Sequence, residues 1–389
     1  MKSFYDVIVV GAGPAGSTAA RFAAEQGVSV LMLEKDRDVG SPVRCGEAIG
    51  KAGVEEFITP DPRWICAYIN KFSLNAPNGT ETIVEYKDTA YVLERKIFDY
   101  EIAKLAAKAG TEILTRAYVN GLIIENDIVS GVKYEYRGEQ IEAGAKVVIA
   151  ADGVESRVGR WAGLQTHIDF RDMESCVQIT ATLPSINTET CYFYLGKEFA
   201  PGGYLWIFPK GESIANIGLG VGGITGKNHQ SALTFLNQFM EKRFPDASIL
   251  TSIAGGVPCI PTLQKISAPG IMLVGDAARQ VNPLSGGGIA SGMISGKIAG
   301  GIAGSAVKNN RLNDILTYDK AWHDRLGKRH ETFNKIKEGI YNFSDEKFNK
   351  IAGVINSIPV DKRTLGKLFT TALIKQPSLL LDVAKVFVV

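Results

Sequence analysis

Apolar residues follow two different patterns along the chain. Mostly apolar runs occur at residues 7–10, 28–33, 146–151 and 271–274, interrupted only by Ser29 and by Lys146 at the start of the third run. Runs of this kind are typical of strands in a parallel sheet, where helices cover both faces. An Ala-rich stretch over 17–26 separates the first two runs and predicts a helix. The chain is therefore expected to open with a strand, a helix and a second strand.

Alternation of apolar and polar residues predicts a second sheet, mostly antiparallel. The alternating segments lie at 177–183, 190–195, 203–209 and 214–221. A helix over 229–243 interrupts them. Earlier, residues 71–86 predict two strands around a Pro-Asn-Gly turn, and 91–95 predict a further strand before a helix over 97–109. Residues 38–50 show neither period and are expected to form a loop.

The buried-strand pattern returns at 271–274 and leads into a small-residue helix over 290–307. The expected fold class is therefore α/β (α+β overall), with a Rossmann-like domain interrupted by an antiparallel sheet. The predicted boundaries are 1–65, 90–165 and 265–310 for the Rossmann-like domain, 66–89 and 166–264 for the inserted sheet, and 311–389 for a helical C-terminal region.

Composition excludes several classes of protein. The net charge of +2 over 389 residues gives no basis for nucleic-acid binding. Five scattered cysteines without C-x-x-C spacing argue against a disulfide framework or a metal site. No run of about 18 apolar residues predicts a transmembrane helix. A nucleotide-binding pattern that begins at residue 5 leaves no signal peptide, so a cytoplasmic protein is expected.

The C-terminal region differs from the rest in charge. Residues 311–389 contain 14 lysines and arginines against 9 aspartates and glutamates. Two segments, 365–369 and 379–387, are apolar with sparse charge. They predict either helices packed on the core or a surface that attaches reversibly to the anionic inner face of a membrane.

A glycine pattern at the first strand–helix junction predicts a nucleotide site. Gly11, Gly13 and Gly16 form G-x-G-x-x-G, which allows a tight turn, close approach of a pyrophosphate and packing of helix on strand. The second strand ends in Glu34, where an acid accepts hydrogen bonds from a ribose. Because strand, helix, second strand and acid stand in order, the motif is more specific than the glycines alone.

Further motifs lie near the ends of later buried strands. They are Asp152-Gly153, Gly275-Asp276 and the triplet Gly286-Gly287-Gly288, which precedes a helix. Arg95 marks another strand-to-helix junction, either as a cofactor contact or as a solvated helix-end residue. Glycines before a helix leave N–H groups free for an electron-rich ligand.

In order and spacing, these motifs resemble the p-hydroxybenzoate-hydroxylase-like FAD proteins over residues 1–310. The resemblance implies one extended FAD, with Asp276 on the ribityl chain and Gly288 and Ile289 near the isoalloxazine. The FAD site that it implies comprises Gly11, Gly13, Ala15, Gly16, Glu34, Arg44, Cys45, Gly46, Ala48, Arg95, Val119, Asp152, Gly275, Asp276, Gly287, Gly288 and Ile289.

A narrower resemblance lies in the inserted sheet. Residues 201–209, Pro-Gly-Gly-Tyr-Leu-Trp-Ile-Phe-Pro, fit the P-x-x-Y-x-W-x-F-P motif of geranylgeranyl reductases, and Arg44-Cys45-Gly46-Glu47 is similar to that family's cysteine loop. On a strand, Tyr204, Trp206 and Phe208 share one face. They are the predicted substrate-binding residues, because three aromatics suit an isoprenoid chain. The alternative is an aromatic core face.

The resemblance implies an archaeal-type FAD-dependent reductase that saturates geranylgeranyl chains on ether phospholipids. Expected partners are this prenylated lipid, an anionic membrane surface and an unidentified electron donor such as NAD(P)H or ferredoxin. Cys45 and Glu47 are the candidate proton donors, with flavin-bound water equally open. Alternatives are the plant-type reductase of geranylgeranyl diphosphate or chlorophyll, an FAD monooxygenase of this fold, and a non-enzymatic prenyl carrier.

Overall fold

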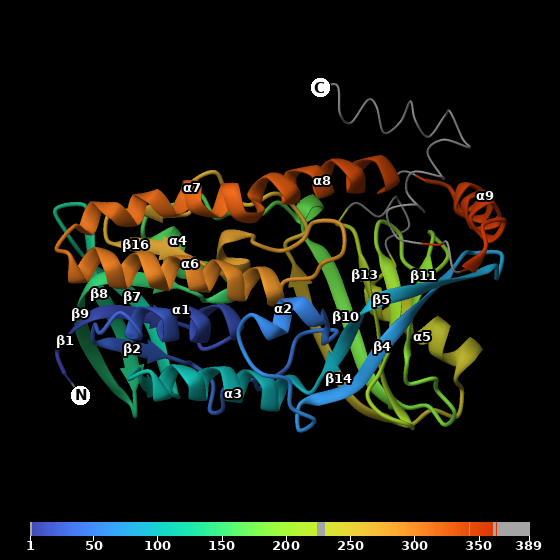
Figure 1. Cartoon of the computed structure of the whole chain (residues 1–389), viewed down its shortest axis with the longest axis horizontal. Coiled ribbons are helices and arrows are strands. Elements are labelled where there is room, and N and C mark those ends of the chain that lie inside the picture. The colour runs from blue at the N-terminus through green and yellow to red at the C-terminus, as the bar shows by residue number, and fades with distance from the viewer. Residues whose placement is uncertain (1, 224–229, 342, 361–362, 364–389) are drawn as a thin grey trace.

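The computed structural model describes residues 2–223, 230–341, 343–360 and 363, which form two eight-stranded sheets with helices around them (Figure 1). The first sheet has the order β15-β16-β9-β1-β2-β6, and β8 and β7 continue from β9. Its strands are β1 Phe4–Val10, β2 Val30–Leu33, β6 Glu112–Leu114, β7 Ala117–Glu125, β8 Ile128–Tyr136, β9 Glu139–Ala150, β15 Ser267–Ala268 and β16 Ile271–Leu273.

The centre of the first sheet is parallel and buried on both faces, as the apolar runs predict. Val9 of β1 pairs with Met32 of β2 on one side and with Ile149 of β9 on the other, and all three side chains are fully buried. Burial of such residues contributes about 1.5–3 kcal/mol each. The carboxyl ends of these strands therefore form a rigid edge, on which the glycine motifs lie.

Helices α1 Pro14–Ala24 and α6 Ile289–Lys308 pack on this sheet, and α3 Arg95–Lys108 packs against α1. Glycines bring α1 and α6 into backbone contact. A Cβ at Gly296 would overlap the carbonyl oxygen of Ala15, and one at Gly300 would overlap that of Ala19. The small-residue composition of α6 is thus explained by packing against α1, and it fixes the first turn of α1 beside the start of α6.

The second sheet has the order β14-β10-β13-β12-β11-β4-β5-β3, mostly antiparallel, with β11 and β4 parallel. Its strands are β3 Ala48–Gly50, β4 Ile65–Asn75, β5 Glu81–Leu93, β10 Glu174–Thr182, β11 Thr190–Leu195, β12 Tyr204–Pro209, β13 Ile214–Val221 and β14 Ile249–Val257. One face packs against α5 Ala232–Arg243. The other face carries the aromatic residues of β12 and turns toward the loop before β3.

Three details differ from the predicted strands. Residues 91–95 are not a separate strand, because β5 runs unbroken to Leu93. The expected loop over 38–50 ends in β3, which pairs with β5. Strand β14 went unpredicted because it is an edge strand with mostly exposed residues and shows no clear alternation. We infer that the inserted sheet comprises 48–93 and 174–257, a slightly longer unit than the pattern indicated.

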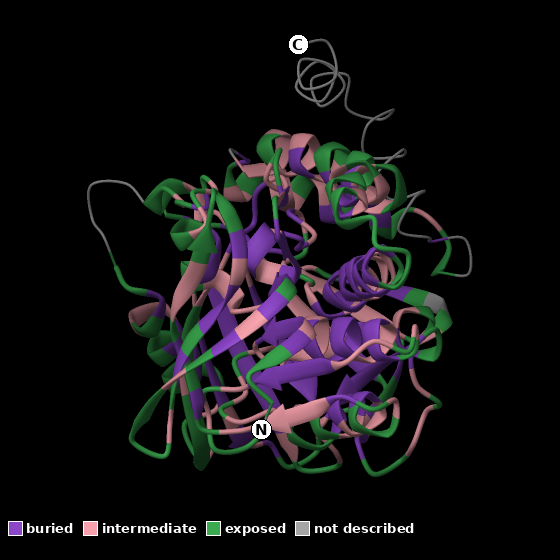
Figure 2. Ribbon diagram, turned by 90° about the vertical axis from the view of Figure 1, so that its left-hand side faces the viewer, coloured by how far each residue is buried: buried purple, intermediate pink, exposed green. Residues whose placement is uncertain are grey.

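The helices after α6 lie along one long side of the molecule and, in the last of them, at one end of it (Figure 1). They are α7 Tyr318–Trp322, a π-helical turn at His323–Gly327, α8 Lys328–Tyr341 and α9 Asp345–Asn356. Buried residues concentrate in the sheets and the helices packed on them, and exposed residues gather on the outermost helices (Figure 2). The apolar segments 365–369 and 379–387 lie outside the described residues. Among the described helices, none is long and apolar enough to cross a membrane.

Candidate active site

The turn after β1 has the shape needed for a pyrophosphate. Gly11 has φ +100°, and a Cβ there would overlap the carbonyl oxygen of Ala151, so only glycine fits. A Cβ at Gly13, by contrast, would meet nothing within 4 Å. This open side faces the first turn of α1, where Ala15 and Gly16 lie and where backbone N–H groups have no intrahelical acceptor. The turn thus offers donors and room to a phosphate.

Glu34 is held beside this turn by the backbone. Its Oε2 accepts a hydrogen bond from the N–H of Ala12 at 2.7 Å, and its Oε1 accepts one from the N–H of Asp36 at 2.9 Å. The carboxylate therefore has a fixed orientation at the end of β2. Each oxygen keeps a further lone pair that can accept from a ribose hydroxyl.

A second cradle lies between the turn after β16 and the start of α6. Gly275 has φ +65°, and its N–H donates to Gln280 Oε1 at 2.7 Å. A Cβ at Gly288, the N-cap of α6, would lie 3.2 Å from Asp276 Oδ1. Burial raises the pKa of Asp276, although the charge of Arg95 opposes this. Asp276, Gly287, Gly288 and Ile289 thus lie together at the helix start.

The other predicted FAD residues lie on the first sheet and on the loop before β3 of the second sheet. The Asp152 carboxyl accepts from the N–H of Val158 at 3.0 Å through Oδ2, while Oδ1 is buried and has no partner among the described residues. Burial raises the pKa of Asp152. Val119 is buried within β7, and Arg44 is exposed near Gly255 of β14. An unpartnered buried oxygen and the two glycine cradles are the features that an extended dinucleotide would fill.

Arg95, the first residue of α3, is engaged within the protein. Its Nε and an Nη donate to the Asp99 carboxylate at 2.6 and 2.7 Å. Burial by itself would lower the pKa of Arg95, but the charge and hydrogen bonds of Asp99, together with the neighbouring Cys45 and Glu47, raise it. The charge of Arg95 still reaches Cys45 and Asp276, since it acts on the pKa of both. Its position is compatible with the predicted cofactor contact.

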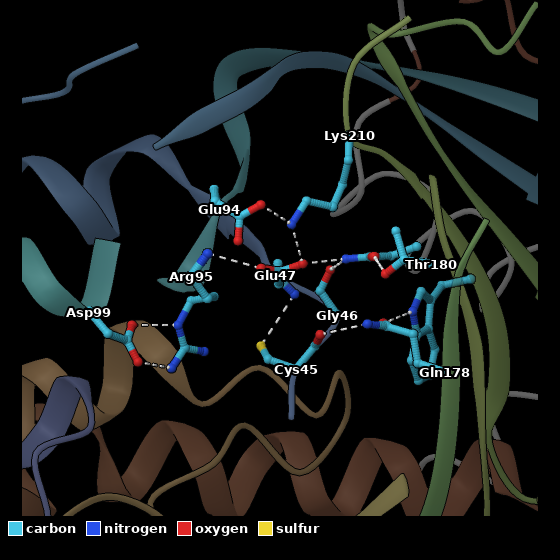
Figure 3. Close-up of polar contacts among 11 residues, drawn as sticks. Cys45, Gly46, Glu47, Glu94, Arg95, Asp99, Gln178, Thr180 and Lys210 are labelled. Atoms are coloured by element: carbon cyan, nitrogen blue, oxygen red, sulfur yellow. Dashed lines mark hydrogen bonds and ion pairs between the residues drawn. The ribbon is translucent and has the colours of Figure 1, made fainter. Parts of the chain in front are cut away.

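The loop that carries Cys45 is fixed through Glu47 (Figure 3). The buried Glu47 carboxylate accepts from Lys210 Nζ at 2.7 Å, from Asn216 Nδ2 at 2.5 Å and from the N–H of Arg95 at 2.9 Å. Glu94 also accepts from Lys210, at 3.0 Å. Burial would lower the pKa of Lys210, yet the charge of Glu47 raises it. Strands β12 and β13 of the second sheet thereby hold the loop in place.

Cys45 itself makes two contacts with its surroundings. Its Sγ accepts from the N–H of Glu47 at 3.2 Å, and its carbonyl oxygen accepts from Gln178 Nε2 at 2.9 Å (Figure 3). Burial raises the pKa of the Cys45 thiol, while the positive charge of Arg95 opposes the shift. The thiol therefore stays protonated at neutral pH.

The predicted aromatic residues form a continuous wall beneath this loop. The rings of Tyr204 and Trp206 are 5.8 Å apart, and those of Trp206 and Phe208 are stacked at 6.2 Å. A Cβ at Gly46 would lie 3.0 Å from the Phe208 ring, so the cysteine loop rests directly on the wall. The Tyr204 hydroxyl donates to the carbonyl oxygen of Ser285 at 2.5 Å. The wall thus joins the cysteine loop to the glycine loop before α6.

Sequence reasoning missed the residues that support the wall. On β13, Asn216, Gly218 and Gly220 pair with Phe208, Trp206 and Tyr204 respectively. A Cβ at Gly218 would lie 2.5 Å from the Trp206 ring, so glycine lets the indole lie flat and reach Gln178 Oε1 at 2.9 Å. Small residues at every second position of a strand were the available signal. Among the described residues, no cluster could hold a metal ion.

Two family models match the chain. The FAD binding domain model matches residues 4–202, and the geranylgeranyl reductase catalytic domain model matches residues 172–257. The second match contains the wall and the strands that support it. The two matches overlap over residues 172–202, which contain β10 and β11.

Several known proteins match over the full length. Digeranylgeranylglycerophospholipid reductase 2 of Methanococcoides burtonii is 43% identical, covering 100% of this chain and 97% of the relative. The Methanocella arvoryzae digeranylgeranylglycerophospholipid reductase is 44% identical, with 98% coverage of both. A geranylgeranyl bacteriochlorophyll reductase-like structure from Thermoplasma acidophilum superimposes with a TM-score of 0.93 at 34% identity, covering 99% of both chains. The structure of a triple mutant of a flavin-dependent brominase shares the fold, with a TM-score of 0.72 at 18% identity. It covers 95% of this chain and 99% of its own.

Proposed function

The chain belongs to the geranylgeranyl reductase family of FAD-binding proteins, and we propose that it reduces the carbon–carbon double bonds of geranylgeranyl chains on digeranylgeranylglycerophospholipids. The protein is an FAD-dependent oxidoreductase. The observation that carries the choice of substrate is the aromatic wall, because it places three aromatic rings, of which Trp206 and Phe208 are buried, against the cysteine loop. That surface suits an isoprenoid chain and would be out of place in a site for a small polar substrate.

The residues described above fit an FAD. We propose that the turn at Gly11–Gly16 holds the pyrophosphate, that Glu34 holds a ribose, and that Asp276 and the N–H groups at the start of α6 hold the ribityl chain and the ring. A bound, reduced FAD would supply the hydride for the reduction of the alkene. The protein then has to supply a proton, exclude water and orient the alkene.

The geometry of the cysteine loop separates the two candidate proton donors, Cys45 and Glu47. Glu47 is saturated by three donors and paired with Lys210, so we assign it a positioning role. Cys45 keeps its proton and has a free S–H to donate. Protonation of a trisubstituted alkene creates tertiary cation character, which the ring faces of the wall stabilise by about 0.5–2 kcal/mol per well-placed ring.

Membrane attachment and the electron donor follow from the substrate. A lipid with two long chains stays in its bilayer, so we propose that the protein binds reversibly to the anionic inner surface of the membrane. The net positive charge of residues 311–389 supports this. NAD(P)H or a ferredoxin-type protein would supply electrons in the cell.

Mass spectrometry of lipid products tests the function. Protein reduced with dithionite is incubated without oxygen with unsaturated digeranylgeranylglycerophospholipid, and each reduced double bond adds two hydrogens to the lipid mass. Free geranylgeranyl diphosphate serves as the competing substrate. Failure to add hydrogen to any prenyl chain, by a protein that holds FAD, would contradict the proposal.

A further inference from the structure

A second candidate binding site lies beneath α8. A cavity of about 930 Å³ is lined on one side by α8. The rest of its lining comes from residues 163–165, 171–172, 260–265 and Arg279. None of the predicted FAD residues lines it. We call it the α8 cavity. Helix α8, which lines the cavity, runs along the side of the molecule where the late helices lie (Figure 1).

The face that α8 turns toward this cavity is polar. Asn334, Lys337, Glu338 and Tyr341 all line it, and their spacing of three, one and three residues places them on one face of the helix. A helix that covers a core normally presents an apolar stripe there. The polar stripe therefore indicates that the cavity receives a polar ligand or solvent.

The charges around the cavity favour an anion. Arg171, Lys265, Arg279 and Lys337 line it, against Asp172 and Glu338. Lys337 Nζ donates to the carbonyl oxygen of Cys259, and the Glu338 carboxylate already accepts from Asn334 Nδ2 at 2.8 Å. The Nε of Arg279 is buried and has no hydrogen-bond partner among the described residues. A buried, unpartnered guanidinium N–H is costly unless a ligand satisfies it.

The α8 cavity adjoins both parts of the candidate active site. Ile260 lines it, and the preceding Cys259 has its Sγ 3.8 Å from where a Cβ of Gly286 would be, in the glycine loop before α6. On the other side, the hydroxyl of Tyr341 lies so close to Gly202 and Gly222 that a Cβ on either would overlap it. These glycines flank the start of β12 and the end of β13, next to Tyr204 of the wall.

We propose that the α8 cavity binds the phosphate-bearing end of the prenyl substrate, with the prenyl chains leading from it toward the aromatic wall. This inference rests on the proposed function and specifies how the same substrate is held. Lys337 and Arg279 would meet the phosphate, because cationic donors form the strongest hydrogen bonds to its oxygens. Leu164, Ile260 and Leu263 would meet the first apolar atoms of the chain. Phosphate on glycerol and free diphosphate share this chemistry.

Charge-removing variants test the proposal through substrate preference. Lys337→Met and Lys265→Met are compared with Lys133→Met, which removes a charge on β8 that is paired with Glu142. Lys133 is exposed like Lys265, whereas Lys337 is half-buried. Lys265 is exposed and forms no ion pair among the described residues, so its loss should not disturb folding. We expect KM for the phospholipid to rise about tenfold or more in Lys337→Met and less in Lys265→Met. KM for the neutral digeranylgeranylglycerol ether should stay unchanged in both variants. In Lys133→Met, KM for the phospholipid should also stay unchanged.

Geranylgeranyl diphosphate distinguishes the two sources of phosphate. If Lys337→Met also raises its KM, the cavity recognises phosphate in general; if only the phospholipid is affected, it recognises the glycerol-linked form. Equal losses for neutral and phosphorylated lipids, or no loss for either, would overturn the proposal.

A binding measurement separates this site from the catalytic function. Glycerol 1-phosphate at millimolar concentration should raise the Tm of the FAD-loaded wild-type protein, and this shift should disappear in Lys337→Met but persist in Lys133→Met. A wild-type protein that shows the shift yet reduces no prenyl lipid would contradict the proposed function alone. A wild-type protein that reduces phospholipid but shows neither the shift nor a preference over the neutral ether would contradict the α8 cavity alone.

Discussion

The two ends of the aromatic wall differ in how their polar groups are satisfied. At the end formed by Phe208, the neighbouring Asn216 and Glu47 are buried and fully bonded, and Lys210 closes the cluster. At the end formed by Tyr204, the neighbouring position is Gly220, and Glu174 has a buried Oε2 with no hydrogen-bond partner among the described residues. We call these the closed end and the open end.

This difference indicates that the two ends of the wall have different roles. A buried ion pair with complete hydrogen bonds holds a single geometry, so the closed end can fix the Cys45 loop. An unpartnered carboxyl oxygen and glycines in place of side chains leave space and unused bonding capacity. The open end also adjoins the α8 cavity, because the charge of Lys337 acts on Glu174. We infer that substrate enters at the open end and reacts toward the closed end.

Breaking the ion pair at the closed end should lower the stability of the protein more than any other change considered below. Lys210→Met leaves the buried Glu47 carboxylate without its cation, and we expect the free energy of unfolding to fall by about 3–5 kcal/mol. Because the pKa of Lys210 is raised, its contribution is present below its ordinary pKa of 10.5 and declines as pH rises through the raised value. Urea unfolding at pH 7 measures the loss.

The double variant Glu47→Gln with Lys210→Met is the control, because it removes both charges and should recover part of the stability. A loss below about 1 kcal/mol in Lys210→Met would show that the closed end is not held by this pair.

Replacing Glu174 at the open end should raise the free energy of unfolding at high pH, whereas breaking the closed end lowers it. Burial raises the pKa of Glu174 from 4.5 to about 7, and Lys337 opposes the shift. The native state thus binds a proton more tightly than the unfolded state, so this group makes stability fall as pH rises from about 4.5 to 7. Glu174→Gln removes that slope. At pH 8 it should be more stable than wild type by up to about 3 kcal/mol, with little difference at pH 4.

Thermal unfolding of wild type and Glu174→Gln across pH 4–8 gives the comparison. Glu189→Gln, at an exposed acid in the turn before β11 of the same sheet, is the control. If the unfolding temperatures of wild type and Glu174→Gln change with pH in the same way, Glu174 has a hydrogen-bond partner in solution. The polar groups at the open end would then be satisfied.

The same contrast explains what could be predicted from sequence. The strand–helix–strand pattern, Glu34 and the aromatic residues of β12 were predicted because each signal is local: a period, a spacing or a motif. Lys210, Asn216 and Gln178 were missed because their roles arise from pairing between strands distant in sequence. Strand β14 was missed because an exposed edge strand has no hydrophobic period. The wall's face was predictable, whereas the difference between its two ends required the register of three strands.

Substitution of the residue between the two ends tests whether the wall acts on the reaction. Trp206→Leu removes a ring that can stabilise positive charge in the transition state, worth about 0.5–2 kcal/mol. We expect kcat to fall about 2- to 30-fold while KM for lipid changes little, because the charge develops only in the transition state. Trp206→Phe keeps a ring face and should be milder. If both variants only raise KM and retain the original kcat, the wall is simply an apolar surface.

The smallest effect on folding, and the sharpest test of the closed end, is expected from Cys45→Ser. The serine hydroxyl is of similar size and can still accept from the N–H of Glu47, so the free energy of unfolding should change by less than about 1 kcal/mol. FAD retention should be unchanged, since Gln178 binds the carbonyl oxygen and not the side chain. A hydroxyl is a far weaker acid than a thiol, so a reaction that takes its proton from Cys45 should slow at least tenfold at saturating lipid. Cys191→Ser, which changes a buried thiol on β11 that packs in the same cluster as Trp206 and Phe208 but is not part of the loop, controls for the general cost of replacing a buried cysteine. If Cys45→Ser folds, holds FAD and reduces prenyl chains at the wild-type rate, the thiol only packs the loop, and the proton must come from the open end or from water.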